Sequence, residues 1–543
     1  MRLLLSLLIS LCVTKIDAQS IPPPVEWQHC YGGSLDDYGY GISATSDGGF
    51  IFAGCAGSND GNIYPKYGNQ LHGGTCDYWV AKIASDSTIQ FKVHKGGTSS
   101  DVARVALQTL DGNFIIGGAA SSNDVDVDDH HGFPAGTPDF WIIKVNSGGI
   151  VLWTKSYGGT SYDDFGSMIL TPDGGYALCG GTQSSDGDVS GNHGSMDFWL
   201  VKTDATGSLQ WQKCFGGDDA TGYEKAFDLK LCKDGGYILV GFTTSQTGEV
   251  QGNHSADFDG WVVKTDASGN LQWAKCFGGT GQDGFYKVRQ LDDGNFLIAG
   301  YAFSNDGDIT GKHGDESYDD AWLTLLDANG NLLWSKAYGG DSTDEFSSIQ
   351  QDQLGGILVS GYSRSKEGDL DVNYGDYDYW LVSIDESGTI LWDSTYGGPY
   401  ADVCNDLAIA TDGRVGLIGY SKSDSIDVSG NHGVDTSHHP LYQARADYWV
   451  VDLGSVVGIH EVQKSTLTVI PTLAHDVVQI SSNDLQEEKS FITVRNESGQ
   501  VILHSTMSHK SKLLLNVSSL PQGIYFIEAK SSTLNAVSKF VKM

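Results

Sequence analysis

Acidic and hydroxyl side chains recur at fixed spacing in two loops of this sequence, and oxygen atoms in that arrangement can bind calcium. In each loop they occupy places 1, 3 and 5, with glycine at place 6, as in a calcium-binding loop. The residues are Asp186, Asp188, Ser190 and, at place 12, Asp197 in one loop, and Asp306, Asp308 and Thr310 in the other. The alternative is that these side chains accept hydrogen bonds from the backbone of their own turns. Calcium is the one cofactor that the sequence indicates.

Loops of the same type carry a histidine in six places and a tyrosine in a seventh. The residues are His72, His131, His193, His254, His313, His432 and Tyr374. Imidazole is a common metal ligand, but each of these side chains belongs to a separate repeat of the chain, and the repeats hold them apart. We therefore expect the histidines to pack in the turns rather than to bind one metal ion.

The motifs of enzyme active sites do not occur in the sequence. It contains no Gly-x-Ser-x-Gly elbow, no His-Glu-x-x-His pair and no glycine-rich phosphate loop that opens a helix. Catalysis needs an asymmetric cluster of groups, whereas the polar residues here recur from repeat to repeat. The sequence therefore favours a binding or scaffold protein, with a protein or glycan ligand, over an enzyme. The alternative is a polysaccharide hydrolase or lyase, which a few clustered carboxylates that break the repeat would indicate.

A repeat of about 60 residues supplies the elements that must position these loops. Its mark is the tripeptide Asp-x-Trp, which occurs seven times at intervals of 58 to 69 residues. The copies begin at Asp77, Asp139, Asp197, Asp259, Asp320, Asp378 and Asp447. Because every copy has the aspartate, we expect a structural role for it, as an acceptor of backbone N–H groups where a strand begins.

Each repeat has the pattern of four short antiparallel strands. In the third repeat these strands are residues 164–171, 176–181, 198–203 and 209–215, and an Asp-Gly dipeptide forms the first turn. Asp-Gly between apolar runs is a strong hairpin signal because the turn requires a positive φ. Four strands per repeat are typical of a β-propeller blade.

The two ends of the repeat region complement each other. The seventh repeat ends at Leu453 without a fourth strand, and the mature N-terminus begins with the missing one, Val25–Tyr31. Pairing of these segments would remove the open edges of a linear array, and a linear solenoid would leave the N-terminal strand unexplained. The sequence thus predicts an all-β fold, in which residues 19–453 form a seven-bladed β-propeller closed by the N-terminal strand.

Residues Asp204–Trp211 and Asp266–Trp273 share the pattern Asp-x-x-Gly-x-Leu-x-Trp. This pattern resembles the tryptophan-docking motif of quinoprotein-like propellers, and the resemblance covers most of residues 25–453. It implies that the tryptophan locks neighbouring blades together. The resemblance concerns the fold alone, because nothing in the sequence matches a quinone site, such as the adjacent cysteine pair of those enzymes.

A different module follows a linker at residues 454–464. From Ser465 to the C-terminus the repeat stops, and short alternating strands predict a small antiparallel β-sandwich over residues 465–543. The expected strands are residues 467–470, 476–480, 491–495, 501–504, 512–516 and 523–528.

Three segments of this module carry a family resemblance. They are Asn496–Val501, Leu515–Phe526 and the terminal Lys539–Met543. Together they resemble the type A sorting domain of the bacterial type IX secretion system, although the usual Tyr-Pro-Asn-Pro start is replaced by Val-Ile-Pro-Thr. The resemblance implies contact with the type IX secretion machinery and passage across the outer membrane. It further implies release or attachment at the cell surface, usually after cleavage of the domain, and a source among the Bacteroidetes and their relatives.

The N-terminus has the features of a secretory signal peptide. Arg2 precedes the apolar run Leu3–Val13, which is too short to span a bilayer, and cleavage is expected before Gln19. Residues 1–18 are therefore expected to be removed on export. No later segment is long and apolar enough to predict a transmembrane helix.

Charge and cysteine content restrict the partners and the redox state of the protein. The chain has 33 basic and 68 acidic residues and a net charge of −35, so its surface repels nucleic acid phosphates and attracts cations. The simpler role of this charge is solubility. Export permits disulfides, and Cys55 and Cys76 could bridge a loop within one repeat. Cys30, Cys214 and Cys276 occupy one equivalent place in separate repeats, where a small buried residue is expected.

Overall fold

The computed structural model divides the chain into two units, Met1–Val457 and Gly458–Met543. In the first unit it describes residues 22–63, 76–132, 136–218, 220–255, 257–314, 317–352, 355–370, 372–432 and 445–456. In the second unit it describes residues 468–470, 473–474, 476–481, 490–496, 501–507, 512–530 and 535–542. The expected signal peptide, residues 1–18, lies outside this part of the chain. No helix in the described part has the length and hydropathy that a membrane span requires.

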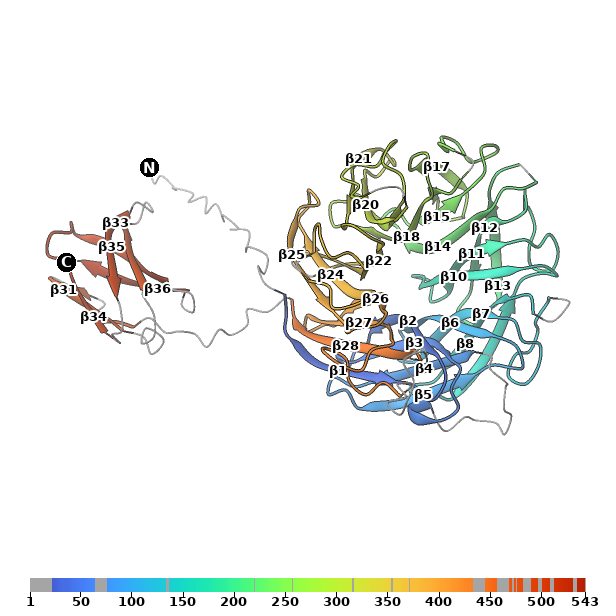
Figure 1. Cartoon of the computed structure of the whole chain (residues 1–543), viewed down its shortest axis with the longest axis horizontal. Helices are drawn as coiled ribbons and strands as arrows, with labels where there is room; N and C mark the ends of the chain where they lie inside the picture. Colours follow the sequence, from blue (N-terminus) through green and yellow to red (C-terminus); the bar gives the residue numbers. More distant parts are fainter. Residues whose placement is uncertain are drawn as a thin grey trace, which may run out of the picture. The chain divides into compact units, whose positions relative to one another are not determined.

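The first unit is all-β, and its described residues form repeated four-stranded antiparallel sheets, as in a β-propeller (Figure 1). Six sheets follow the chain order and consist of β2 (Asp37–Ala44), β3 (Phe50–Ala56), β4 (Asp77–Ile83) and β5 (Ile89–Lys95); β6 (Asp101–Gln108), β7 (Phe114–Ala120), β8 (Asp139–Val145) and β9 (Val151–Tyr157); β10 (Asp163–Leu170), β11 (Tyr176–Thr182), β12 (Asp197–Thr203) and β13 (Leu209–Phe215); β14 (Glu224–Leu231), β15 (Tyr237–Thr243), β16 (Asp259–Thr265) and β17 (Leu271–Phe277); β18 (Asp283–Gln290), β19 (Phe296–Ala302), β20 (Asp320–Leu326) and β21 (Leu332–Tyr338); β22 (Asp344–Gln351), β23 (Ile357–Ser363), β24 (Asp378–Ile384) and β25 (Ile390–Tyr396). A short 3₁₀ helix, Gly61–Ile63, lies between β3 and β4.

The seventh four-stranded sheet joins the two ends of the unit. It contains β26 (Asp402–Ile409), β27 (Arg414–Ser421), β28 (Asp447–Ser455) and the N-terminal β1 (Val25–Tyr31), in the order β1-β28-β27-β26. In the antiparallel ladder between β1 and β28, Cys30 lies opposite Trp449. β28 continues past the expected boundary at Leu453, since the Gly454 N–H donates to the Pro24 carbonyl at 2.8 Å. The segment predicted to be a linker therefore begins inside a strand.

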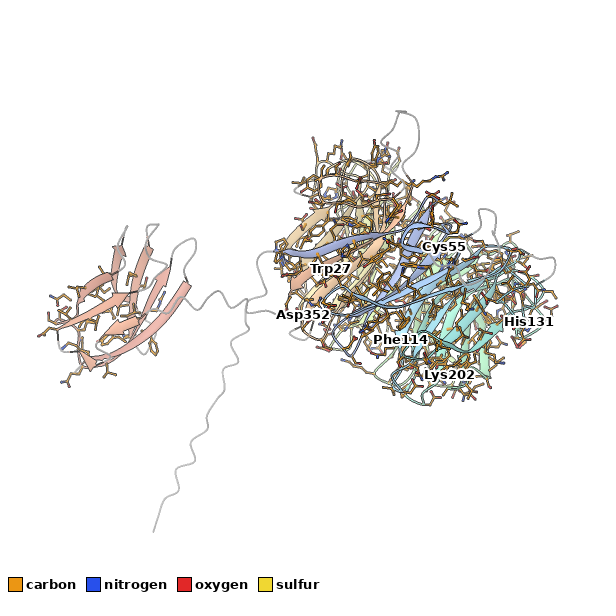
Figure 2. All side chains as sticks on the ribbon, turned by 90° about the horizontal axis from the view of Figure 1, so that it is seen from below. Trp27, Cys55, Phe114, His131, Lys202 and Asp352 are labelled. Atoms are coloured by element: carbon orange, nitrogen blue, oxygen red, sulfur yellow. A yellow bond between two sulfur atoms is a disulfide. The ribbon has the colours of Figure 1, made fainter. Side chains whose placement is uncertain are left out.

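The Asp-Gly pairs build the first hairpin turn of most sheets. Gly174 has a φ of 84°, a conformation that glycine adopts without strain. Asp173, beside it, accepts a hydrogen bond at 2.7 Å from Lys202, whose side chain is buried (Figure 2). Equivalent ion pairs are Asp47–Lys82, Asp111–Lys144 and Asp234–Lys264. In the last sheet the charges are exchanged, and Arg414 binds Asp452. One carboxylate thus shapes the turn and neutralises a buried cation.

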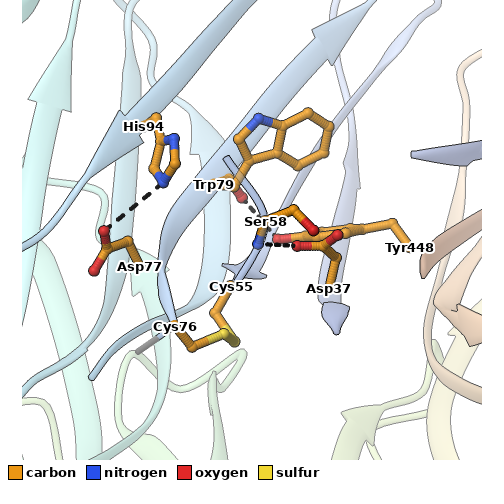
Figure 3. The surroundings of a disulfide bond; sticks show 8 residues. All are labelled: Asp37, Cys55, Ser58, Cys76, Asp77, Trp79, His94 and Tyr448. Carbon is orange, nitrogen blue, oxygen red and sulfur yellow. Dashed lines mark hydrogen bonds and ion pairs between the residues drawn. A yellow bond between two sulfur atoms is a disulfide. The ribbon is translucent and has the colours of Figure 1, made fainter. Parts of the chain in front are cut away.

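The middle residue of Asp-x-Trp joins each sheet to the next. Tyr78 packs on Trp141 of the following sheet, with ring centroids 4.7 Å apart, and its hydroxyl donates to the Trp141 carbonyl at 3.0 Å. Tyr448 of the last sheet makes the same contacts with Trp79 of the first, at 4.8 Å and 3.2 Å (Figure 3). Aromatic pairs of this kind stabilise an interface beyond the area that they bury. The first and last sheets of the unit are therefore packed together like consecutive ones.

Two copies of Asp-x-Trp have no aromatic middle residue, and the following sheet compensates. At Gly260 an added Cβ would lie 2.5 Å from Phe285, whose ring fills that place and stacks on Trp322 at 4.4 Å. Where the middle residue is Ala321, Phe346 stacks on Trp380 at 5.0 Å. The tryptophan of the next sheet thus always has an aromatic partner, from one strand or another.

The tryptophan of the fourth strand docks on a glycine of the next sheet. Gly207, with a φ of 78°, would bring a Cβ to 2.9 Å from the ring of Trp153, so that no other residue fits. The equivalent pairs are Trp211–Gly269, Trp273–Gly330 and Trp334–Gly388. The resemblance to a tryptophan-docking propeller predicted this contact between neighbouring sheets, and the geometry agrees with it.

A disulfide joins Cys55, in β3, to Cys76, just before β4, as the sequence indicated (Figure 3). The two Cα atoms lie 5.3 Å apart. Cys30, Cys214 and Cys276 are buried free thiols, in agreement with the expectation of a small buried residue at that place.

The second unit consists of two sheets. One has the order β29-β31-β34 and the other β30-β36-β35-β32-β33. Their strands are β29 (Thr468–Ile470), β30 (Leu473–Ala474), β31 (Val477–Ser481), β32 (Ser490–Asn496), β33 (Val501–Met507), β34 (Lys512–Asn516), β35 (Gly523–Lys530) and β36 (Asn535–Lys542). Val478, Ile492, Leu515 and Ile527 belong to one hydrophobic core. Six of these strands match the predicted ones, whereas β30 and β36 were not predicted from the sequence.

Candidate functional site

The carboxylates at place 1 of the predicted calcium loops accept hydrogen bonds from a neighbouring loop. Asp186 accepts two hydrogen bonds from Thr160, from its N–H and its hydroxyl, each at 2.8 Å. Asp306 accepts the same pair from Thr280, at 2.8 and 2.9 Å. Thr160 lies between β9 and β10 and Thr280 between β17 and β18, so these contacts join two loops and differ from the bonds within one turn that the sequence offered as the alternative.

The other predicted ligands also have protein partners. Asp188 and Asp308 each accept the N–H of a glycine of the preceding Gly-Gly pair, at 3.4 Å. Ser190 accepts from Gln212 at 2.7 Å, and Thr310 donates to the carbonyl of Ser335. Within the described residues, no group of three or more His, Cys, Asp or Glu side chains is placed to hold a metal ion. The calcium sites stay a prediction.

Asp197, the last predicted ligand, belongs to an arrangement that recurs along the chain. Its carboxylate accepts the N–H of His193 at 2.8 Å and lies 2.7 Å from the ring nitrogen Nδ1 of that histidine. The equivalent Nδ1–carboxylate pairs are His131–Asp139, His254–Asp259, His313–Asp320 and His432–Asp447, at 2.6 to 3.2 Å. The histidines thus pack in separate turns, as expected, and the aspartates accept backbone N–H groups. His72 lies outside the described residues.

Two acidic side chains from neighbouring sheets meet beside the first glycine of most Gly-Gly pairs. A Cβ at Gly158 would lie 2.6 Å from Asp139 and 2.8 Å from Asp163, both completely buried. Similar pairs flank Gly96, Gly216, Gly278 and Gly397. Burial raises the pKa of Asp163, and the nearby Asp139 adds to the rise, so that the value reaches about 6. Burial likewise raises the pKa of Asp259, Asp344 and Asp402 to about 6 and that of Asp37 and Asp378 to about 7.

We expect the first unit to become more stable as the pH falls from 8 to 5. A carboxyl group with a raised folded-state pKa stabilises the fold fully below its unfolded pKa, and this contribution is lost as the pH rises through the folded value. For Asp163 the pH window lies between the unfolded pKa of 3.8 and the folded pKa of about 6, and the contribution to the free energy of unfolding is on the order of 2–3 kcal/mol. The hydrogen bond from Lys202 lowers the pKa of Asp173 to about 2. This carboxylate therefore stabilises the fold above its unfolded pKa and loses that contribution only as the pH falls towards 2.

Calorimetric melting at pH 5, 6, 7 and 8 measures this dependence. We expect the melting temperature to rise by several degrees towards pH 5. Asp163→Asn removes one titrating group and should flatten the slope, whereas Asp292→Asn, at an exposed position, should not. A melting temperature that falls steadily from pH 8 to pH 5 would contradict the raised pKa values.

Every inner strand of the first unit has a β-bulge at its fourth residue. In β2 the register shifts between Gly39 and Gly41 and leaves Tyr40 without a partner in the ladder. Figure 1 shows these strands nearest the centre of the unit, and a bulge re-aims the side chain that it carries. The bulged residues are Tyr40, Arg104, Gly166, Phe227, Tyr286, Ser347 and Asn405. All seven line one pocket, which we call the axial pocket.

The axial pocket has a volume of about 240 Å³ and is also lined by Val105, Lys287, Glu345 and Tyr362. The seven bulged residues differ in size, charge and polarity, although the positions around them repeat. This site was not predicted from the sequence, and none of the predicted calcium ligands lines it. The sequence does mark this site. Each inner strand begins with a buried acidic residue, and the residue three positions later differs from repeat to repeat.

Aromatic rings line one side of the axial pocket. Phe227 lies 5.3 Å from Tyr286 between ring centroids, and Tyr286 lies 5.2 Å from Tyr301. Phe227 also contacts Phe242 at 5.6 Å. These four rings come from two neighbouring sheets. Of the four, Phe227 and Tyr286 line the pocket and offer flat apolar faces of the kind that bind the apolar surface of a small ligand, while Phe242 and Tyr301 pack against them.

Two acidic side chains share a hydrogen bond on the same side of the pocket. Glu345 lies beside Asp319, and the hydroxyl groups of Tyr286 and Tyr362 bond to it. Burial first, and then the Asp319 charge, raise the pKa of Glu345 to about 8. Burial also raises the pKa of Asp319. With a pKa of about 8, Glu345 is protonated at neutral pH and can donate a hydrogen bond to Asp319.

Arg104 and Lys287 are the basic residues that line the pocket. The guanidinium of Arg104 lies over the ring of Tyr40, 5.2 Å from its centroid. Lys225 is bound by Asp164, and Lys287 lies 3.6 Å from Asp406. Lys287 thus has a carboxylate neighbour, whereas the Arg104 guanidinium lies against an aromatic ring.

The fold and the comparisons define an exported all-β protein with propeller-like sheets. Residues 468–543 match the family model described as secretion system C-terminal sorting domain. The second unit is thus a sorting domain of the type IX secretion system. It marks the chain as a protein secreted to the cell surface or the extracellular medium.

Solved structures similar to this chain share little sequence with it. A puromycin hydrolase is 11% identical with a TM-score of 0.42, over 86% of this chain and 64% of its own, so this chain spans less than two thirds of that length. An endosialidase of phage phi92 is 11% identical, with a TM-score of 0.37, over 95% and 87%. The PQQ-bound aldose sugar dehydrogenase from Streptomyces coelicolor is 8% identical, with a TM-score of 0.32, over 64% and 94%. No curated protein matches the sequence.

Proposed function

We propose that the first unit is a closed seven-bladed β-propeller that binds a glycan in the axial pocket at the cell surface or outside the cell. The observation that carries this proposal is the set of seven β-bulges, whose residues, six with side chains and one glycine, vary from sheet to sheet and line one cavity. A structural role alone would be served by the same residue in every blade, as at the Asp-x-Trp positions. Variation at the one place where all blades meet is typical of a ligand site built on a rigid scaffold.

Closure of the ring is what brings these side chains together. The pairing of β1 with β28 and the Tyr448–Trp79 contact between the last and first sheets support it. Residues of the first sheet, such as Tyr40, and of the seventh, such as Asn405, then face the same space. The Asn405 side chain donates to the Gly39 carbonyl at 2.7 Å across this junction.

Titration calorimetry with a panel of oligosaccharides tests the proposal. The mature chain, residues 19–543, is expected to bind at least one glycan, and Phe227→Ala or Tyr286→Ala should weaken binding about 10-fold or more by removing an aromatic face. Tyr400→Ala, at an exposed loop position, is the matched control and should bind normally. Binding that survives both pocket substitutions would place the ligand elsewhere.

A second candidate function is that of a polysaccharide hydrolase or lyase. Glu345 and Asp319 favour it, because they are carboxyl groups that break the repeat and hold a proton for transfer at neutral pH. Their direct hydrogen bond places them closer together than the roughly 5–9 Å that separates the carboxyl pair of most glycosidases. Release of reducing sugar by the native chain and its loss in Glu345→Gln would support this function, whereas binding without turnover would exclude it for the glycan tested.

A further inference from the structure

Arg104 differs from the other cations near the axial pocket in having no carboxylate partner. Lys225 is paired with Asp164 and Lys287 with Asp406. Within the described part of the chain, no ion pair within 4.0 Å involves Arg104, and its buried Nε atom has no hydrogen-bond partner. In a chain with 68 acidic residues this is unusual. An unpaired buried donor in a folded protein requires an explanation.

The position of Arg104 fits a ligand better than a structural role. Its bulge directs the side chain to the axial pocket, and the ring of Tyr40 supports one face of the guanidinium. The edge of a guanidinium carries a planar fork of N–H donors, which matches the two oxygens of a carboxylate. Stacking leaves that edge available for an anion.

The rest of the pocket indicates what accompanies the anion. Phe227 and Tyr286 offer apolar faces, and Glu345, hydrogen-bonded to Asp319, is the carboxyl group that lines the pocket and can bond to hydroxyl groups. The volume of about 240 Å³ lies below the roughly 300–1,000 Å³ of pockets for drug-sized ligands, which suits a single monomer unit. A small ring with a carboxylate at one end and hydroxyl groups at the other is an acidic sugar.

We propose that the axial pocket recognises a carboxylate-bearing sugar residue, with the carboxylate bound by Arg104 and the hydroxyl groups facing Glu345. This inference rests on the proposed glycan binding and narrows it to one substrate class. The Lys225–Asp164 pair stands nearby and adds no net charge, so the guanidinium supplies the positive charge for the anion.

The test compares acidic sugars with their uncharged counterparts. The probes are oligosaccharides that carry galacturonate, glucuronate, mannuronate or sialate, each measured by titration calorimetry against its own methyl ester. For at least one probe the mature chain should bind the acid about 10- to 100-fold more tightly than the ester, as expected for a charge-assisted bidentate contact.

Substitutions at Arg104 then assign the preference. Arg104→Gln should bring the acid down to the affinity of the ester, and Arg104→Lys should retain only part of the preference because the fork is lost. Arg364→Gln, where the native arginine is half exposed and paired with Asp376, is the matched control and should keep the full preference. Equal melting temperatures of the variants show that each one is folded.

The outcomes separate this inference from the proposed function. If neutral sugars bind in a manner that depends on Phe227 and Tyr286 while no acid exceeds its ester, glycan binding stands and the acidic class is wrong. If an acid is preferred but Arg104→Gln leaves the preference unchanged, the assignment of the arginine is wrong. If no sugar binds, or a peptide with a free C-terminal carboxylate binds more tightly than every sugar, both proposals fail.

Discussion

A chain that lacks residues 22–33 is expected to lose the cooperative folding of its first unit. Without β1, the strand β28 would become an open edge, although nearly all of its residues are buried in the native unit. The deletion also removes Tyr31, 5% exposed, which packs on Phe52 and Trp79 of the first sheet. Loss of one strand therefore damages two neighbouring sheets. We expect aggregation on expression and no single melting transition.

A circular permutant is the sharpest control for this deletion. The chain would begin at residue 34 and run to Val456, and a short loop would then lead into residues 24–33. Because β1 runs antiparallel to β28 with Val25 opposite Leu453, this connection is a hairpin. We expect the permutant to melt within a few degrees of the native unit. A β1 deletion that melts like the native unit, or a permutant that fails to fold, would contradict closure by the N-terminal strand.

Removal of residues 535–543 is expected to stop export across the outer membrane. These residues include β36, which lies between β30 and β35 in the larger sheet of the sorting domain. Eight residues of β36 pair with β35, from Gly523↔Lys542 to Lys530↔Asn535. Deletion of a strand from inside a sheet removes its ladder and exposes the core beneath it. The type IX secretion machinery would then encounter an unfolded sorting domain.

The measurement is the distribution of the protein between periplasm, cell surface and medium, in a bacterium with a type IX secretion system. We expect the native chain at the surface or in the medium and the shortened chain almost wholly in the periplasm. The first unit of the shortened chain should melt normally, because it is a separate unit. Residues 458–543 fused to a periplasmic protein should direct that protein outward. Export of the shortened chain would show that the sorting signal lies elsewhere.

The sequence by itself determined the strands of the first unit. Their signals are local: Asp-Gly turns such as Asp173-Gly174 require a positive φ, and short apolar runs between such turns form strands. The surplus strand Val25–Tyr31 and the missing strand after Leu453 matched each other in type, and β1 pairs with β28 in the structure, while closure of the ring stays a prediction. The sorting domain was evident because its motifs are contiguous in the chain.

Tertiary structure decided the axial pocket and the partners within it. Tyr40 and Asn405 are far apart in the sequence, and only the arrangement of the sheets brings them to one cavity. The β-bulge at each of these residues cannot be recognised from the alternation of polar and apolar residues. One extra residue in a strand gives the same pattern as a turn that lies one residue later. The Glu345–Asp319 pair likewise joins two sheets. Backbone hydrogen bonds and alternation are properties of neighbouring residues, whereas a cavity depends on how distant elements pack.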